Sequence, residues 1–403
     1  MNREPKRLLM KCSEIYARDR IFSGGIYIEN NIIKEILDED DLKNINYKDI
    51  EIYSFRKNYK IIPGIIDLHI HGLMGADTMD GNLDVFNRMS EYLPQEGVTS
   101  FLATTITSDD KTTKKTLTLI SNFMNRNNFK GATLLGINLE GPFISKEKSG
   151  AHNKELVLNP DVGIFEEWQY ISGNNINIVT IAPELPGAFD FIQRFRDNVA
   201  ISLGHTNCSY EVACKAIDYG ARLATHLFNA MSGIDHKTPG AALAVLLTEN
   251  PMLSEIIVDK IHLHEVVVKL IYKLLGKKRI ILISDAMRAK GLGTGIYEFG
   301  GNKIFVDKLA ARLQDGTLAG SLLKMNHAIK NMIDITKASL SDVISMVSEN
   351  PAKLLNIYNK KGSIDIGKDA DMVVLDNNFN VVMTLSMGKI VYISDEKCFN
   401  KYF

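Results

Sequence analysis

The middle of the chain alternates short apolar stretches with longer segments of helical character. Eight stretches rich in Val, Ile and Leu recur there, at residues 61–72, 98–105, 134–143, 176–184, 199–206, 222–231, 253–262 and 279–287. Near-continuous apolar strands separated by helices are typical of a parallel sheet buried on both faces. Eight such units predict an α/β fold, a (β/α)8 TIM-type barrel over residues 61–358. A doubly wound open sheet is the alternative, because strand number alone does not exclude it.

The two ends of the chain show a different pattern. Residues 22–36 predict a β-hairpin, with Gly24 and Gly25 before one strand and residues 29–31 as the turn. Residues 362–393 alternate apolar strands with Gly and Asn turns in the same way. We therefore predict a small β-sandwich domain that is assembled from residues 1–60 and 359–403 and flanks the barrel.

Polar residues end nearly every predicted barrel strand. His69 and His71 end the first strand, and side chains at positions i and i+2 of a strand point to the same side. Four other strands end in Glu140, His205, His226 and Asp285. The carboxyl ends of all eight strands of a TIM barrel converge on one face, so these groups are expected to meet. A lone His-x-His motif also fits two hydrogen-bonded structural histidines, but the six groups together favour a metal site.

Imidazole with carboxylate is a ligand set that suits zinc or iron better than magnesium or calcium. We therefore predict a site for a divalent metal ion. The net charge of −1 argues against nucleic acid or an acidic membrane as the main partner. No apolar run approaches the roughly 18 residues that a membrane span needs. Four cysteines without metal or disulfide spacing, and no signal-peptide pattern, predict a cytoplasmic protein.

Several short motifs resemble those of the N-acetylglucosamine-6-phosphate deacetylases of the amidohydrolase superfamily. They are PGIIDLHIHG, LEGPF, SGAHN, APE, GHT, THLFNAM, SDAM and DGTLAGS. The resemblance covers nearly the whole chain, including the small β-domain built from its two ends. His-x-His and Ser-Asp-Ala are common to many amidohydrolases, whereas THLFNAM, LEGPF and TLAGS in this order are more specific. The resemblance implies hydrolysis of the acetamide of N-acetylglucosamine 6-phosphate to glucosamine 6-phosphate and acetate, by a homodimer.

The resemblance also implies roles for particular residues. Glu140, His205 and His226 match the metal ligands found throughout the family. His69 and His71 match an extra pair of ligands that occurs in those members able to hold a second ion. Asp285 matches the catalytic acid/base, and His152 matches a residue that approaches the acetyl carbonyl. Substrate-binding positions are matched by Ala151, His152, Asn229, Ala230, His262, Leu318, Ala319 and Gly320. In the expected reaction a metal-bound hydroxide attacks the carbonyl, because metal lowers the pKa of water from about 15.7 toward 7.

Two positions depart from the family pattern and bear on the phosphate. Lys237, with His236 beside it, stands where relatives usually carry an arginine that contacts the substrate phosphate, often from the neighbouring subunit. Lysine keeps the charge but loses the bidentate fork of arginine. Lys260 replaces a glycine near the pocket, where it would add a cation or exclude the usual sugar. N-acetylgalactosamine 6-phosphate or another N-acyl substrate therefore remains an alternative.

Two other functions are disfavoured. Amidohydrolases that act on cyclic amides often carry a bridging lysine at the end of the fourth strand, where this chain has the APE motif. A non-catalytic amidohydrolase-like scaffold would be expected to have lost metal ligands or the acid/base. All six groups are present in this chain, so we expect a metal-dependent amide hydrolase.

Overall fold

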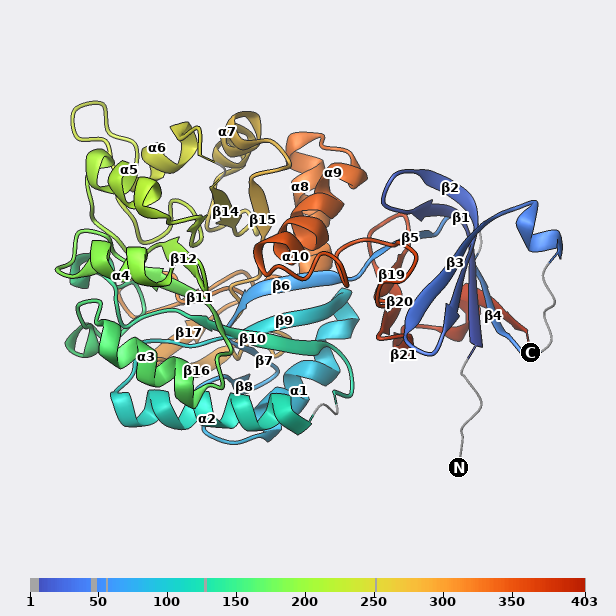
Figure 1. Cartoon of the computed structure of the whole chain (residues 1–403), viewed down its shortest axis with the longest axis horizontal. Coiled ribbons are helices and arrows are strands. Elements are labelled where there is room, and N and C mark those ends of the chain that lie inside the picture. Colours follow the sequence, from blue (N-terminus) through green and yellow to red (C-terminus); the bar gives the residue numbers. More distant parts are fainter. Residues whose placement is uncertain (1–6, 45–48, 56, 127–128, 251, 403) are drawn as a thin grey trace.

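Strands from the middle of the chain and strands from its two ends form separate sheets. The structure is a computed structural model that describes residues 7–44, 49–55, 57–126, 129–250 and 252–402. Figure 1 shows the barrel on the left and the sheet that holds the first and last strands on the right. Within the described residues, no helix has both the length and the apolar character needed to cross a membrane.

Eight parallel strands follow one another in chain order through the barrel sheet. They are β6 (Ile65–Ile70), β9 (Val98–Thr104), β10 (Thr133–Leu139), β11 (Ile176–Ile181), β12 (Ala200–Leu203), β13 (Leu223–Ala224), β14 (Leu253–Ile256) and β15 (Ile280–Leu282). The sheet closes on itself after β15, where the N–H of Asp285 donates to the carbonyl of His69 at 2.8 Å. Closure excludes the doubly wound alternative, and the predicted TIM-type barrel is confirmed.

Helices cover the outside of the barrel. They are α1 (Asp84–Tyr92), α2 (Asp110–Arg126), α3 (Val162–Ile171), α4 (Ala188–Phe195), α5 (Tyr210–Tyr219), α6 (Ala241–Leu247), α7 (Glu265–Leu275), α8 (Met325–Thr336), α9 (Leu340–Ile344) and α10 (Asn350–Leu354). Asp161 and Ser209 cap α3 and α5 by accepting backbone N–H groups of the first turn, which would otherwise lack partners. A π-helical turn joins α9 to α10.

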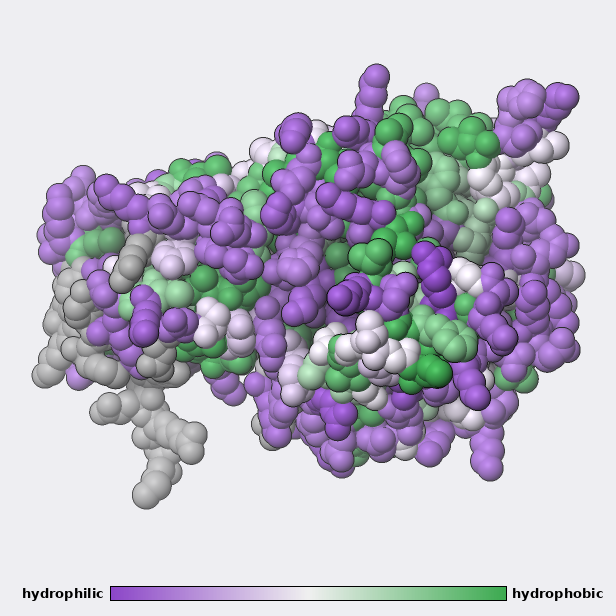
Figure 2. Space-filling view, turned by 180° about the vertical axis from the view of Figure 1, so that it is seen from behind, coloured by the Kyte–Doolittle hydropathy of each residue, from purple (hydrophilic) through white to green (hydrophobic). Residues whose placement is uncertain are grey.

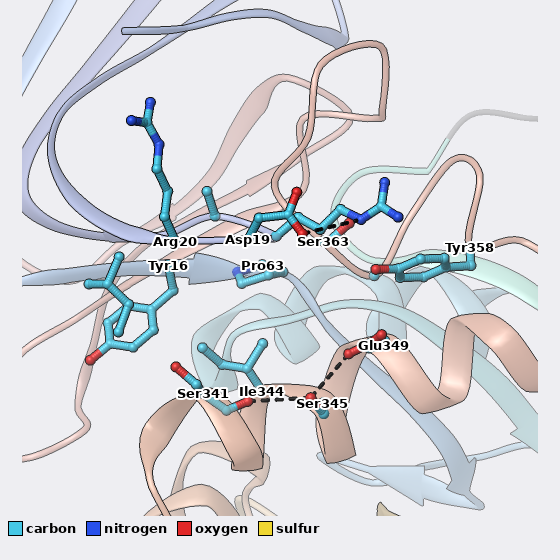
Figure 3. A pocket seen from close by; sticks show the side chains of 14 residues that line it. Tyr16, Asp19, Arg20, Pro63, Ser341, Ile344, Ser345, Glu349, Tyr358 and Ser363 are labelled. Carbon is cyan, nitrogen blue, oxygen red and sulfur yellow. Dashed lines mark hydrogen bonds and ion pairs between the residues drawn. The ribbon is translucent and has the colours of Figure 1, made fainter. Parts of the chain in front are cut away.

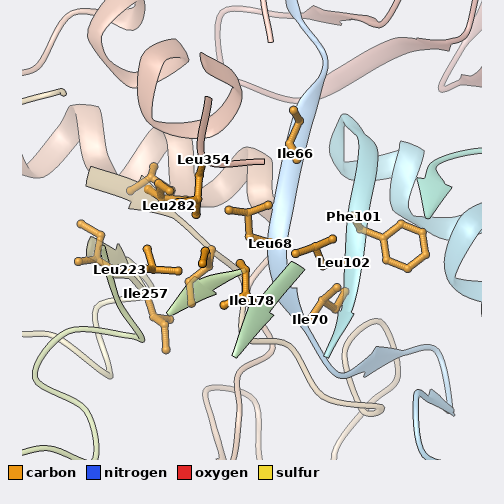
Figure 4. Packing of buried hydrophobic residues seen from close by; sticks show 14 of the residues in the cluster. Ile66, Leu68, Ile70, Phe101, Leu102, Ile178, Leu223, Ile257, Leu282 and Leu354 are labelled. Atoms are coloured by element: carbon orange, nitrogen blue, oxygen red, sulfur yellow. The ribbon is translucent and has the colours of Figure 1, made fainter. Parts of the chain in front are cut away.

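Apolar side chains fill the barrel interior. Figure 4 shows Leu68, Leu282 and Leu354 pointing into the same space from two strands and α10. Phe101 and Leu102 leave β9 on opposite sides, as successive residues of a strand must. All five side chains are at most 7% exposed. The core therefore occupies the barrel below the ends of the strands, where the polar groups begin.

Strands from both ends of the chain form one mixed nine-stranded sheet. Its members are β1 (Arg7–Tyr16), β2 (Ile21–Glu29), β3 (Ile32–Asp38), β4 (Glu51–Phe55), β5 (Lys60–Pro63), β19 (Met372–Leu375), β20 (Val381–Ser386), β21 (Lys389–Ile393) and β22 (Phe399–Tyr402). β5 pairs with β19, with Ile62 opposite Val373, so the two ends of the chain are joined directly. The predicted hairpin is present as β2 and β3, with Asn30 at φ 59° in its turn.

The predicted fold class, a TIM-type barrel with a small β-domain built from both ends of the chain, is therefore confirmed. The domain boundaries after residues 60 and 358 stay a prediction. Two smaller sheets add to the barrel. One is the hairpin of β7 (Gly72–Leu73) and β8 (Ala76–Asp77), and the other consists of β16 (Gly295–Phe299), β17 (Asn302–Val306) and β18 (Ala311–Arg312). The second sheet follows the eighth barrel strand and brings Phe299 to the face where the strands end.

Candidate active site

The carboxyl ends of five barrel strands bring imidazole and carboxylate groups together. The six residues predicted from the strand ends form one cluster: His69, His71, Glu140, His205, His226 and Asp285. Each is at most 7% exposed. The backbone φ values of His205, His226 and Asp285 are 48°, 28° and 48°, in the left-handed region that side chains other than glycine rarely adopt. Such strained backbone gathers at functional sites, where the surrounding structure holds it in place.

Glu140 lies at the centre of the cluster. Its Oε1 is 3.1 Å from His205 Nε2 and 2.8 Å from His226 Nε2. Its Oε2 is 3.4 Å from His69 Nε2 and 3.2 Å from His71 Nε2. Asp285 Oδ1 lies 3.4 Å and 3.2 Å from the same two nitrogens. The Nε2 atoms of all four rings therefore point at Glu140, with two rings near each of its oxygens. The Nε2 atoms of His69 and His71 also lie near Asp285.

The Nδ1 atoms of His69 and His205, the outer ring nitrogens that point away from the cluster, face hydrogen-bond acceptors. His69 Nδ1 is 3.1 Å from Glu255 Oε2, and His205 Nδ1 is 2.8 Å from the carbonyl oxygen of Lys148. Facing a carboxylate or a carbonyl oxygen as acceptor, each Nδ1 carries the ring hydrogen, and the lone pair of the neutral ring is on Nε2. Inside the cluster, His69 Nε2 is only 3.3 Å from His71 Nε2. Lone pairs that converge beside carboxylates in this way fit a divalent cation.

The ring hydrogen of His152 lies on the opposite nitrogen. The backbone N–H of Thr107 donates to His152 Nδ1 at 3.1 Å, which leaves the hydrogen of the neutral ring on Nε2. Burial lowers the pKa of His152 to about 4, so the ring is neutral near pH 7. His152 Nε2 lies 3.4 Å from Glu140 Oε2. Although its spacing would allow metal ligation, this ring is arranged to donate a hydrogen bond.

The buried charges of the cluster depend on one another. Burial lowers the pKa of His69, but Glu140, Glu255 and Asp285 raise it well above its usual value. Burial also lowers the pKa of His71, whereas hydrogen bonds to Asp285 and Glu140 raise it to about 9. For Asp285, burial raises the pKa and the neighbouring His69 and His71 lower it to about 2. The Asp285 carboxylate is thus ionised at neutral pH and attracts cations, whether protons or metal ions.

A cavity of about 400 Å³ opens beside the cluster. The predicted residues that line it are His71, Glu140, Ala151, His152, His205, His226, Asn229, Ala230, His262, Asp285, Leu318 and Gly320. His69 and Ala319 are fully buried next to these lining residues. His262 is held by Asp259, whose Oδ2 is 2.7 Å from its Nδ1, so its other ring nitrogen is left for a ligand.

Three predicted substrate contacts do not line this cavity. The Lys260 ammonium lies 3.2 Å from Glu265 Oε1. His236 and Lys237 are exposed in the segment before α6. Their contact with a substrate phosphate, from this subunit or a second one, stays a prediction.

Several residues of the cavity wall were not predicted from the sequence. Lys148 and Lys154 lie between β10 and α3, and neither ammonium forms an ion pair within the described part of the chain. The other unpredicted lining residues are Glu147, Ser149, Gly150, Phe299, Asp315 and Thr317. The lysines that flank the SGAHN motif were the available signal, because an anionic ligand needs local positive charge in a chain of nearly zero net charge.

A second cavity, of about 370 Å³, lies where the end sheet meets the barrel (Figure 3). Its two arginines are neutralised by acids, since Arg18 pairs with Asp365 and Arg20 with Asp38, each at 3.1 Å. Its glutamate, Glu349, accepts hydrogen bonds from neighbouring side chains. Among the described residues, the groups spaced to hold a metal consist of the six residues of the cluster at the barrel strand ends and the adjacent His152. The barrel cavity is therefore the candidate active site.

Known proteins share this fold and much of this sequence. Residues 61–391 match the amidohydrolase family. The N-acetylglucosamine-6-phosphate deacetylase of Bacillus subtilis is 43% identical over 339 residues, covering 83% of this chain and 85% of that protein. The N-acetylgalactosamine-6-phosphate deacetylase of Escherichia coli O157:H7 is 33% identical over 331 residues, covering 82% and 87%. A mutant N-acetyl-D-glucosamine-6-phosphate deacetylase of Mycobacterium smegmatis, in complex with N-acetyl-D-glucosamine-6-phosphate, superimposes with a TM-score of 0.88 at 27% identity, covering 96% of this chain and 99% of that one.

Proposed function

This chain is a member of the amidohydrolase family, and from that premise we propose that it hydrolyses N-acetylglucosamine 6-phosphate to glucosamine 6-phosphate and acetate. The observation that carries the proposal is the cluster of four histidines and two carboxylates beside a cavity of about 400 Å³. Similarity to the Bacillus subtilis deacetylase over 83% of the chain supports the same chemistry. We also propose a cytoplasmic location, which agrees with four free cysteines.

The cluster would hold one or two divalent ions, with zinc or iron favoured by its imidazole and carboxylate donors. In this proposal Glu140, His205 and His226 would hold one ion, and His69 and His71, which lie beside Glu140, would hold a second. A bound ion of this kind supplies a water molecule of lowered pKa and polarises the amide carbonyl.

Asp285 is proposed to carry the proton of the reaction. Its carboxylate is ionised at neutral pH, so it can accept a proton from the attacking water. It then returns this proton to the departing nitrogen, because an amine is a poor leaving group until it is protonated. His152 donates its Nε2 hydrogen to the acetyl oxygen as negative charge develops there, as donors of an oxyanion hole do. No nucleophilic serine or cysteine is required.

The sugar phosphate is proposed to bind along the other wall of the cavity. Asn229, Ala230 and His262 line it, together with Leu318 and Gly320, and Ala319 is buried between the last two. Lys148 and Lys154 also line this cavity, and their ammonium groups would suit a phosphate because opposite charges attract more strongly where water is partly excluded. A contribution by Lys237 or His236 would come from a second subunit.

A homodimer is part of the proposal. Helix α7 presents Val266, Leu270 and Leu274 to solvent, one turn apart, at 63%, 39% and 43% exposure. Figure 2 shows hydrophobic surface gathered over the upper edge of the barrel, where α6 and α7 lie. An exposed apolar stripe of this kind is typical of a protein contact surface.

Acetate release by the purified, metal-loaded protein tests the proposal, with the 6-phosphates of N-acetylglucosamine and N-acetylgalactosamine offered in parallel. Turnover of the first sugar phosphate, lost in Asp285→Asn, is the expected result. Preference for N-acetylgalactosamine 6-phosphate would instead assign to this chain the activity of the Escherichia coli relative, which is 33% identical. Absence of turnover of either, with metal bound, would contradict the proposed substrate class.

A further inference from the structure

Glu255 is a buried carboxylate that lies next to the cluster but does not line the cavity. It belongs to β14 and is 0% exposed. Its Oε2 is 3.1 Å from His69 Nδ1 and accepts the backbone N–H of His226 at 3.4 Å. Its Oε1 is buried, and no described residue forms a hydrogen bond with it. A buried carboxylate with one unsatisfied oxygen is costly unless positive charge lies nearby.

We propose that Glu255 is a positioning residue for His69 as a metal ligand. As an acceptor at Nδ1, it keeps the ring hydrogen on that nitrogen and turns the Nε2 lone pair toward Glu140 and Asp285. Its second contact, with the backbone of His226, fixes the carboxylate relative to another proposed ligand. Partners of this kind orient the ring and raise its basicity, and their loss typically weakens metal binding by about 10–100-fold.

The other three rings of the cluster lack such a partner. His205 Nδ1 faces a neutral backbone carbonyl. The Nδ1 atoms of His71 and His226 are buried without a hydrogen-bond partner among the described residues. An anionic partner on the outer nitrogen is thus particular to His69 in this cluster. Loss of Glu255 should therefore weaken the binding of an ion held through His69 and leave unchanged the binding of an ion held through His205 and His226.

This inference rests on the proposed metal-dependent function, but metal binding tests it without any substrate. We would titrate the metal-free protein with Co²⁺ against a competing chelator, and follow the visible absorption of the bound ion. In Glu255→Gln we expect one Co²⁺ to bind about 10–100-fold more weakly with an altered spectrum. Ser254→Ala is the matched control, because Ser254 is equally buried on the same strand and points to its other side. This variant should bind Co²⁺ like the wild type.

A His69→Ala background separates positioning from a general structural effect. If Glu255 acts through His69, adding Glu255→Gln to His69→Ala weakens Co²⁺ binding no further. Unchanged affinity in Glu255→Gln, or an equal further loss in the His69→Ala background, would overturn the inference. Should Glu255→Gln fail to fold by circular dichroism, Glu255→Asp retracts the carboxylate by one methylene and allows the same comparison. A wild-type protein that binds Co²⁺ but hydrolyses neither sugar phosphate would contradict the proposed substrate and leave the role of Glu255 intact.

Discussion

At the scale of single residues, the partner of each outer ring nitrogen distinguishes a proposed ligand from a proposed donor. A carboxylate at His69 and a carbonyl at His205 place the ring hydrogen on Nδ1. A backbone N–H at His152 places it on Nε2. Three imidazoles within one cluster can therefore take different chemical roles, because their surroundings fix different tautomers.

Replacing His152 separates these roles. In His152→Ala we expect kcat to fall by about 10²–10³, the usual effect of removing one donor to a developing oxyanion. Metal content should not change, since the His152 lone pair is already engaged by Thr107. Acetate release and metal analysis of the same preparation provide the measurement. A proportional loss of bound metal would identify His152 as a ligand instead.

Asp285→Asn should prevent the proton transfer and leave most of the metal bound. The amide cannot accept the proton of the attacking water, so we expect kcat to fall by about 10²–10⁴ or more. Most of the metal should remain, because four histidines and Glu140 are unchanged. Asp334→Asn, on the surface in an ion pair with Lys330, is the control and should have wild-type kcat. A variant of Asp285 with nearly normal turnover would rule out its role as acid/base.

At the scale of elements, the segment between β10 and α3 supplies the cations of the cavity. Replacing Lys148 or Lys154 by alanine should raise KM for the phosphorylated sugar roughly tenfold or more, since a hydrogen bond to a charged group contributes about 1.5–3 kcal/mol. The value of kcat should change less, because the amide lies at the metal cluster. Lys146→Ala is the matched control on the same segment, where the side chain is exposed and does not line the cavity. Equal KM values for the wild type and the three lysine variants would mean that the phosphate binds away from Lys148 and Lys154.

Aromatic packing beneath this segment stabilises the barrel wall. Phe191 of α4 contacts Phe143, Phe165 and Phe195, with ring centroids 4.7–5.4 Å apart. Because Phe191 is fully buried, Phe191→Ala should lower the free energy of unfolding by about 3–5 kcal/mol. Phe189→Ala, at a half-buried position of the same helix, should cost less. Urea unfolding of both variants measures the difference, and equal losses would contradict it.

Strand ends were predictable from the sequence, whereas contacts across the barrel were not. Glu140 and Asp285 could be placed together because parallel strands of a barrel end on one face. Glu255 lies inside an apolar strand and its partner His69 is 186 residues away, so no local pattern indicates their contact. Lys148 and Lys154 belong to a connecting segment, whose path is not determined by hydrophobic periodicity. The single predicted strand at 61–72 divides at Gly64, where a Cβ atom would lie 2.1 Å from Thr99 Oγ1.

At the scale of the whole molecule, a buried ion pair fastens the end sheet to the chain that returns from the barrel. Lys361 Nζ is 2.6 Å from Asp371 Oδ2, and both side chains are at most 8% exposed. The carbonyl of Asp371 also accepts the N–H of Gly64, which lies between β5 of the end sheet and β6 of the barrel. The returning chain and the segment between the two sheets therefore meet at a polar contact that is shielded from solvent.

The exposed stripe on α7 gives the remaining prediction, which concerns assembly. Leu270 lies at its centre, and an aspartate there would place an unpaired charge in an apolar contact surface. We expect Leu270→Asp to convert a dimer into a monomer in sedimentation velocity experiments. If Lys237 reaches the phosphate from the second subunit, KM should rise in the same variant while the bound metal is retained. Tyr170→Asp, at an 83% exposed aromatic residue on α3, is the control and should leave both assembly and KM unchanged. A wild-type protein that sediments as a monomer would contradict the dimer and confine phosphate binding to the residues of one chain.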